Sequence, residues 1–324
     1  MIEDVTIWHN TAWVQASNLP LSICVPFYRF DVGRLADRLI KLSDKLRDSV
    51  EIVFADDGSR DVAAAERLRQ KFQQGNVPAT LAVFQNNQGR AIIRNRLIEL
   101  AQGRFAIFLD ADMLPDADDF VARYLALARQ DDADIVVGGC TFDQVQKVPT
   151  SQQLDLYHGI RTQCESAEVR NKSAARYVFT NNLMVRRETL LRLPFDQGYT
   201  GWGYEDTDWG FAVVRLGARI LHIDNTATHL GLSDDSSLIK KHRESVVNYR
   251  RLAQKYPVET ATLPVSKAVH LVSKLPLPFS YMAMAAEHLI KTTFIPVRIR
   301  RVLLQSFRIF MYSALARQPG KALG

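Results

Sequence analysis

Cysteine is scarce in this chain of 324 residues, which has only three. Cys24, Cys140 and Cys164 are odd in number and far apart in the sequence, so we expect no disulfide framework and a reducing compartment. Apolar, strand-like sequence surrounds Cys24 and Cys140, which predicts two small buried thiols.

Long apolar runs and a leader-like beginning are also missing. The sequence holds no stretch of about 18 uninterrupted apolar residues, the length that a spanning helix needs. Its first residues lack the basic-then-apolar order of a secretory signal. Hydrophobic residues make up 47% of the chain and charged residues 23%, as in globular enzymes. We therefore expect a cytoplasmic protein that is at most peripheral to a membrane.

Acidic residues are nearly absent from the end of the chain. Residues 261–324 contain nine lysines and arginines but one acid, Glu287, whereas the whole chain has a net charge of +6. Apolar and basic residues interleave between Lys291 and Tyr312, a pattern typical of a helix lying on an anionic membrane. A helical cap on the rest of the protein, or an oligomer interface, is the alternative. One apolar-rich strip does not fit nucleic-acid binding.

Strand-like apolar runs alternate with helical periodicity between residues 21 and 260. This pattern predicts an α/β fold with a mostly parallel sheet flanked by helices and joined by right-handed crossovers. The predicted strands cover 21–25, 51–55, 80–84, 104–109 and 134–138, and the predicted helices cover 34–46, 63–72, 89–101 and 119–128.

Two groups of aspartates follow predicted strands. Asp56 and Asp57 close the second strand, and Asp110 and Asp112 close the fourth. Ligands of parallel sheets bind beyond the carboxyl ends of the strands, and an Asp-x-Asp pair there suits a divalent metal that holds a phosphate. The run 201–208 (Gly-Trp-Gly-Tyr-Glu-Asp-Thr-Asp) supplies further carboxylates, which suit a general base. The sequence thus predicts metal-dependent group transfer from a phosphorylated donor.

These motifs occur together, in order, in a known family. The segments Val25–Tyr28, Asp56–Ser59, Asn87–Arg90, Arg94–Asn95 and Asp110–Asp112 resemble the nucleotide-binding half of family 2 glycosyltransferases with a GT-A fold. The segments 180–185 and 201–208 are similar to the acceptor half of chondroitin-polymerase and β-1,4-galactosyltransferase domains. The resemblance covers about residues 19–257, which leaves 1–18 as an N-terminal strap and 258–324 as a basic amphipathic helical tail.

The resemblance implies a nucleotide site. Asp57 would accept the N3–H of uracil, and Tyr28 would stack on the base. Pro26 would shape the strand end. Asp110 would contact the ribose, and Arg90 would meet the uridine or the diphosphate as a fixed cation.

The resemblance also implies a metal site. Asp112 would bind Mn or Mg, which would bridge the phosphates of the donor. His229, in Thr228-His229-Leu230-Gly231, would complete the site and favour Mn, because nitrogen ligands suit it better than Mg. His222 lies within a strand-like run and is expected in the core instead.

The acceptor half carries the implied chemistry. Asp206 resembles the base that deprotonates the acceptor hydroxyl, and Glu205 would hydrogen-bond sugar hydroxyls. Trp202 would stack on a sugar ring, with Gly203 and Asn182 beside the acceptor. One base opposite one leaving group implies inversion at the anomeric carbon.

Several of these residues have a structural alternative. Asp56–Ser59 fits a turn, because Asp-Gly is a common turn pair, and Asn182 fits a turn as well. Arg94 fits the solvated face of a helix. Asp116 and Asp208 fit helix caps, where acids suit the helix dipole.

The resulting prediction is an inverting, metal-dependent transferase. It would move a hexose or N-acetylhexosamine from a UDP-sugar to a glycan or lipid-linked glycan in surface-polysaccharide synthesis, at the inner face of the membrane. The alternatives are a retaining polypeptide-type hexosaminyltransferase, against which Asp206 argues, and a silent nucleotide- or sugar-binding subunit that docks on a membrane. A nucleotidyltransferase would need a glycine-rich basic loop after the first strand, and residues 27–30 (Phe-Tyr-Arg-Phe) are not one.

Overall fold

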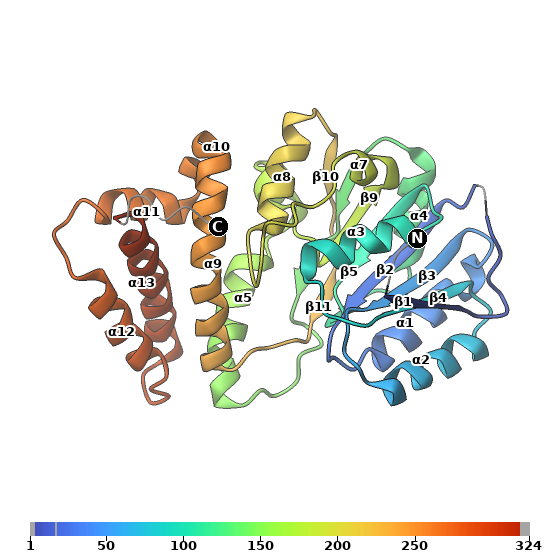
Figure 1. The fold of residues 1–324 in the computed structure, drawn as a ribbon, viewed down its shortest axis with the longest axis horizontal. Coiled ribbons are helices and arrows are strands. Elements are labelled where there is room, and N and C mark those ends of the chain that lie inside the picture. The colour runs from blue at the N-terminus through green and yellow to red at the C-terminus, as the bar shows by residue number, and fades with distance from the viewer. Residues whose placement is uncertain (1–3, 17, 318–324) are drawn as a thin grey trace. The chain divides into compact units, whose positions relative to one another are not determined.

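The structure is a computed structural model that describes residues 4–16 and 18–317. The chain forms two compact units, drawn in Figure 1. The sheet unit contains the described residues up to 145, together with 163–197 and 212–231. The helical unit contains 146–162, 198–211 and the described residues from 232 onward.

The sheet unit is built on an eight-stranded sheet in the order β1-β4-β3-β2-β5-β9-β7-β10. Strands β2, β3, β4 and β5 are parallel to their neighbours in this group, as β7 is to β10, whereas β1 and β9 run antiparallel. The expected mostly parallel α/β sheet is therefore confirmed. The strands are β1 (Val5–His9), β2 (Leu21–Phe27), β3 (Val50–Asp56), β4 (Ala79–Phe84), β5 (Phe105–Leu109), β7 (Ile135–Val137), β9 (Asn182–Arg186) and β10 (Ile220–His222).

Helices connect the successive parallel strands. Their apolar residues recur at helical spacing, so that in α1, for example, Leu35, Ala36 and Leu39 are buried on one face. The crossover helices are α1 (Gly33–Ser43, followed by the 3-10 turn η1, Asp44–Leu46), α2 (Val62–Gln74), α3 (Arg90–Leu100) and α4 (Phe120–Gln130). Shorter elements are α6 (Ala167–Asn171), η3 (Ala174–Tyr177) and α7 (Arg187–Arg192).

Pro26 does not stop the first predicted strand, because β2 continues to Phe27. The carbonyl of Phe27 accepts the N–H of Asp57 on the β3 side, so the nitrogen of Pro26 faces the opposite neighbour, β5. Pairing with β5 ends at Cys24. The missing N–H of proline therefore costs no ladder hydrogen bond.

The predicted N-terminal strap forms an edge strand over Val5–His9. Strand β1 pairs antiparallel with β4, from Val5 opposite Phe84 to His9 opposite Thr80. Next in the chain, the buried Asn10 side chain donates to the carbonyls of Phe72 and Val77 at 2.9 Å. Residues 1–3 and 17 of the predicted strap lie outside the described residues.

A second, three-stranded sheet in the same unit positions part of the site. Its order is β6-β11-β8, with β11 antiparallel to β6 and parallel to β8. The pairing aligns His229 of β11 with Met113 of β6, the residue after Asp112. The strands are β6 (Met113–Pro115), β8 (Cys140–Thr141) and β11 (Ala227–His229).

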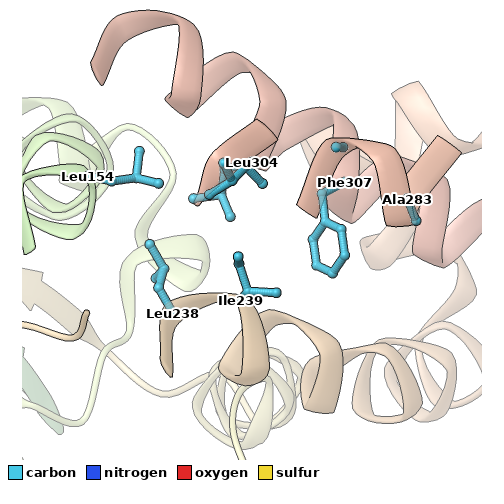
Figure 2. Close-up of a cluster of buried hydrophobic side chains, with 8 residues drawn as sticks. Leu154, Leu238, Ile239, Ala283, Leu304 and Phe307 are labelled. Carbon is cyan, nitrogen blue, oxygen red and sulfur yellow. The ribbon is translucent and has the colours of Figure 1, made fainter. Parts of the chain in front are cut away.

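The helical unit has its own apolar core. Figure 2 shows Leu154, Leu238, Ile239, Leu304 and Phe307 gathered from three helices. Because α9 (Asp235–Lys255) and α13 (Val297–Ala316) share this core, packing does not separate residues 258–317 from the preceding helix at the predicted boundary. The elements are η2 (Thr150–Gln152), α5 (Gln153–Gln163), α8 (Glu205–Arg215), α9 (Asp235–Lys255), α10 (Pro257–Thr262), α11 (Pro264–Val272), α12 (Phe279–Ile290) and α13 (Val297–Ala316).

The basic residues of the tail do not all face outward. Arg300 is buried, forms an ion pair with Asp235 and donates through Nε to the carbonyl of Ile290 at 2.7 Å. Among the described residues, no helix has both the length and the apolar composition that crossing a bilayer requires.

Candidate active site

Asp57 lies just beyond the end of β3, where its carboxylate orders the loop that leads into α3. Its Oδ1 accepts the backbone N–H of Gln88 at 2.8 Å, and its Oδ2 accepts the N–H of Gly89 and the Asn87 amide at 3.0 Å. Burial raises the pKa of Asp57 to about 6, although the two backbone N–H groups oppose this shift. A carboxylate has about four acceptor positions, so roughly one remains for a ligand.

Tyr28 and Asp57 follow neighbouring parallel strands, and Arg90 begins the helix after the loop that Asp57 orders. Tyr28 follows β2, the neighbour of β3, and Asp57 donates its N–H to Phe27 at 2.8 Å. The Tyr28 ring is 42% exposed, with the Arg29 guanidinium 5.0 Å from its centre. Arg90 is an exposed first residue of α3, directly after the loop that Asp57 holds.

Asp110 follows β5 and pairs with an arginine from inside the protein. Arg94 of α3 is 2% exposed and donates to Asp110 Oδ1 at 2.8 Å. The alternative that Arg94 solvates a helix face is therefore wrong. The Arg94 guanidinium thus holds one oxygen of Asp110, and the Asp110 side chain remains partly exposed.

Asp112 and His229 lie side by side in the small sheet. His229 Nε2 is 3.3 Å from Asp112 Oδ2, and the N–H of Leu230 donates to the Asp112 carbonyl at 2.8 Å. Gly231 approaches even closer, because a Cβ built on it would lie 2.0 Å from Asp112 Oδ2. Any side chain at position 231 would thus displace the carboxylate.

The geometry of this pair fits a divalent cation. Two ligands about 2.1 Å from one ion and at right angles lie roughly 3 Å apart, close to the observed spacing of Asp112 and His229. Within residues 4–16 and 18–317, no three side chains of His, Cys, Asp or Glu are arranged to hold an ion by themselves. An ion here would need phosphate oxygens or water as further ligands, which is how Mg²⁺ and similar ions bind with nucleotides.

Asp116 organises the small sheet behind this pair. Burial alone would raise its pKa, but hydrogen bonds from Thr228, Gln144, Thr226 and Thr141 outweigh burial and lower it. The hydroxyl of Thr228, next to His229, donates at 2.6 Å. Asp116 therefore fixes β11 rather than capping a helix as the sequence suggested.

The acidic motif of the helical unit lies in the first turn of α8. Glu205 is buried and Asp206 is half-buried. Asp206 Oδ1 accepts the N–H of Thr207 at 2.7 Å. Negative side chains in this turn interact favourably with the helix dipole, so the motif can hold several carboxylates together.

The loop before α8 is held by a residue that sequence reasoning missed. The Asn248 side-chain amide, on α9, lies 2.9 Å from the carbonyls of Thr200 and Gly203 and 3.3 Å from that of Trp202. Gly203 has φ +93°, a conformation that glycine adopts without steric cost. Asn248 thus fixes the backbone that leads to Glu205.

Tyr204 adopts φ +74°, a conformation that costs a bulky residue about 1–3 kcal/mol. Its hydroxyl is 3.0 Å from that of Tyr312 in α13, which is 2.8 Å from Ser245 Oγ. Burial, followed by the Tyr312 hydroxyl, raises the pKa of Tyr204. The C-terminal helix therefore supports the acidic motif from within the helical unit.

Trp202 is half-buried, and its ring packs edge-on against His242 with ring centres 5.3 Å apart. His242 is buried, and burial, with Arg308 next, places its pKa well below the usual value. A neutral His242 thus serves as a packing partner of Trp202, part of whose indole remains accessible.

The structure changes the interpretation of two predicted residues. Asn182 is fully buried, and its amide bonds Tyr124 Oη and the carbonyls of Gly139 and Asn225. Such a side chain has no free group for a sugar, so we withdraw it as an acceptor contact. Asp208 is buried against Tyr199 and Lys255 instead of capping α8. His222 is a core residue, as expected.

Sequence reasoning missed Asn248, Tyr312 and Gly231 for different reasons. Gly231 lies two residues after His229 in the sequence, but only the structure shows how closely it approaches Asp112. Asn248 and Tyr312 lie 45 and 108 residues from their partners in the 203–204 loop, and no local signal marks such pairs.

Two known proteins are similar to this chain in sequence. The chain is 25% identical to the uncharacterized glycosyltransferase YfnE of Bacillus subtilis, covering 60% of each protein. It is 24% identical to chondroitin synthase of Pasteurella multocida, covering 64% of this chain and 24% of that protein. The chain thus spans less than two thirds of both relatives.

Two solved structures share the fold of this chain. The mannosyltransferase PcManGT of Pyrobaculum calidifontis, in complex with GDP-Man and Mn2+, matches with a TM-score of 0.52 and 18% identity over 94% of this chain and 89% of that one. TarS 1-349 of S. aureus, in complex with UDP, matches with 0.51 and 17% over 92% of each. The expected GT-A fold is confirmed. The model of glycosyl transferase family 2 matches residues 22–191, more than half of the chain, and the protein belongs to that family.

Proposed function

We propose that the protein is an inverting, metal-dependent glycosyltransferase that moves a sugar from a UDP-sugar to a carbohydrate acceptor. The observation that carries the proposal is the pair Asp112 and His229, 3.3 Å apart, in the unit that also presents Asp57 and Asp110 at its strand ends. Membership of the family supports glycosyl transfer. The donor, the metal and the stereochemistry are the proposed parts.

Asp57 is proposed to read the base. Its remaining acceptor position would take the N3–H of uracil, and the exposed Tyr28 ring would stack on the base. Asp110, held by Arg94, would accept a ribose hydroxyl, and Arg90 would approach the diphosphate. TarS was solved with UDP, which supports this donor class, whereas PcManGT was solved with GDP-Man. Uracil is preferred here because a single carboxylate acceptor matches its single N3–H donor.

Asp112 and His229 are proposed to hold a divalent ion, with Mn favoured by the nitrogen ligand. When bound, such an ion neutralises the charge that develops on a leaving diphosphate. The residues themselves are kept in place by the register of β6 and β11 and by the hydroxyl of Thr228 on Asp116. PcManGT in its complex with Mn2+ supports the choice of metal.

Asp206 is proposed as the general base. It would take the proton of the acceptor hydroxyl as that oxygen forms a bond to the anomeric carbon, while the bond from this carbon to UDP breaks and UDP leaves with the electron pair. Glu205 would position a sugar hydroxyl, and the accessible part of Trp202 would pack on a sugar ring. A single displacement of this kind inverts the anomeric configuration.

The acceptor is proposed to be a glycan, carried by a lipid at the inner face of the membrane. The basic tail, with nine cations and one acid in residues 261–324, supports a location on anionic lipid. Polysaccharide synthesis is the process in which such an acceptor would occur.

Calorimetric titration of UDP into the full chain, first with Mn and then with a chelator, tests the proposal. We expect Mn-dependent UDP binding, weaker GDP binding, and weaker Mn-dependent binding in Asp112→Asn. A panel of UDP-sugars would then identify the donor, and NMR of the product would report the anomeric configuration. Absence of UDP binding with any metal would overturn the roles of Asp57, Asp110 and Asp112. It would favour a silent docking subunit.

A further inference from the structure

We propose that the tip of the hairpin formed by α12 and α13 inserts into the surface of an anionic lipid bilayer. The hairpin tip is defined as residues 288–302, the end of α12, the connecting turn and the start of α13. Figure 1 shows the two helices side by side. The inference deepens the proposed membrane location by naming the segment that enters the lipid.

The hairpin tip exposes large apolar side chains. Phe294 is 88% exposed, Val302 61%, Ile299 52% and Leu289 41%. Isolated exposed apolar residues are ordinary on soluble proteins, but these four fall within 14 consecutive residues at one end of a hairpin. A group of this kind marks an interaction surface.

The charge of the hairpin tip selects the partner. Residues 288–317 contain no aspartate or glutamate, and the tip carries Arg298 and Arg301 among its apolar residues, whereas Lys291 pairs with Glu287 of α12 at 2.9 Å. Arg298 is exposed between Phe294 and Val302. Cations that border an apolar patch complement the phosphates of anionic lipids, each contributing near the surface. The same tip of a second protein copy would bring the same positive charge and be repelled.

The hairpin tip is rigid enough to keep this surface exposed. Arg300 Nε donates to the Ile290 carbonyl at 2.7 Å, which joins the start of α13 to the end of α12. Arg300 also pairs with the buried Asp235 of α9. On the inward side, Ile290 and Leu304 are fully buried in the core of the helical unit. The outward residues therefore cannot collapse into that core.

The depth of insertion follows from this arrangement. The inward face of α13 packs in the protein core, so only the tip and its outward face are available to lipid. Such a surface reaches the boundary of headgroups and acyl chains, where Phe is buried and Lys and Arg remain with the phosphates.

Sedimentation of the full chain with vesicles tests the proposal. One set of vesicles contains phosphatidylcholine alone. The other also contains about one third phosphatidylglycerol, an anionic lipid that attracts lysine and arginine. We expect binding to the anionic vesicles only. Phe294→Ser should reduce the partition roughly tenfold or more, and Arg298→Gln about fivefold, with the latter loss vanishing at high salt. Val62→Ser is the matched control, since Val62 is 83% exposed in the sheet unit, and it should bind as the wild type does.

Both tip side chains are exposed, so folding of the variants should match that of the wild type by circular dichroism. The proposal would be overturned if the wild-type protein did not sediment with anionic vesicles, or if the tip variants bound them as well as the wild type does. A change from dimer to monomer in Phe294→Ser, without any vesicle binding, would assign the tip to a second copy and also overturn it. UDP titration of the same samples tests the proposed transferase function separately, because the proposed donor site does not include the hairpin tip.

Discussion

The sheet unit and the helical unit position their carboxylates by different means. In the sheet unit, Asp57, Asp110 and Asp112 follow strand ends, which a parallel sheet brings to one edge. In the helical unit, Glu205 and Asp206 follow a loop whose shape depends on Asn248 and Tyr312 from distant helices. The sheet unit thus has the features of a binding site fixed by topology. The helical unit has a motif that is only as well placed as its supporting side chains.

If the helical unit supplies the chemistry and the sheet unit the binding, Asp206→Asn separates them most sharply. We expect transfer to fall by about 10²–10⁴-fold, the usual contribution of a general base, while Mn-dependent UDP affinity stays unchanged. Steady-state kinetics and calorimetry on the same sample measure both quantities. Turnover close to that of the wild type would remove Asp206 as the base, and a parallel loss of UDP binding would end the division of roles.

Gly231→Ala changes the sheet unit instead of the helical unit, because it disturbs the pair Asp112 and His229. Its Cβ would lie 2.0 Å from Asp112 Oδ2, so the carboxylate must move from His229. We expect a loss of about 10–100-fold in metal affinity, as when a group that orients a metal ligand is removed. Binding of UDP in the presence of a chelator should not change. His229→Ala is the matched variant, and a Gly231→Ala protein with normal Mn affinity would show that the contact is irrelevant.

The sequence predicted the sheet unit well and the helical unit poorly. Continuous apolar runs such as residues 51–55 and the acids after them are local signals, and parallel strand ends meet at one edge. The tail was predicted as a separate segment because its charge differs from the rest. Arg300, however, pairs with Asp235, and Leu304 packs on the α9 core. Composition describes a segment but not its partners.

Asn248→Ala tests whether the 200–203 loop needs its support. The substitution leaves the carbonyls of Thr200 and Gly203 without the amide, at a cost of about 1–3 kcal/mol if they remain buried. We expect kcat to fall roughly tenfold with little change in UDP affinity, and the melting temperature to drop. Asn248→Asp, which keeps the size but lacks the donors, should behave like the alanine variant. Normal kcat in both would show that Asp206 does not depend on this loop.

The smallest expected effect is the pH dependence of UDP-sugar affinity, which tests the sheet unit alone. The pKa of Asp57 is raised to about 6, first by burial, so the carboxylate is the ionised acceptor above that pH and the protonated acid below it. Affinity for a UDP-sugar should therefore decline as the pH falls through 6, by several-fold between pH 7 and 5.5. A UDP-sugar is preferable to UDP, whose terminal phosphate titrates near pH 6 itself. Asp57→Asn should bind more weakly at pH 7 and show a flat profile, because its side chain does not titrate. If the decline persisted in Asp57→Asn, the titrating group would lie elsewhere, and the assignment of uracil recognition to Asp57 would lose its support.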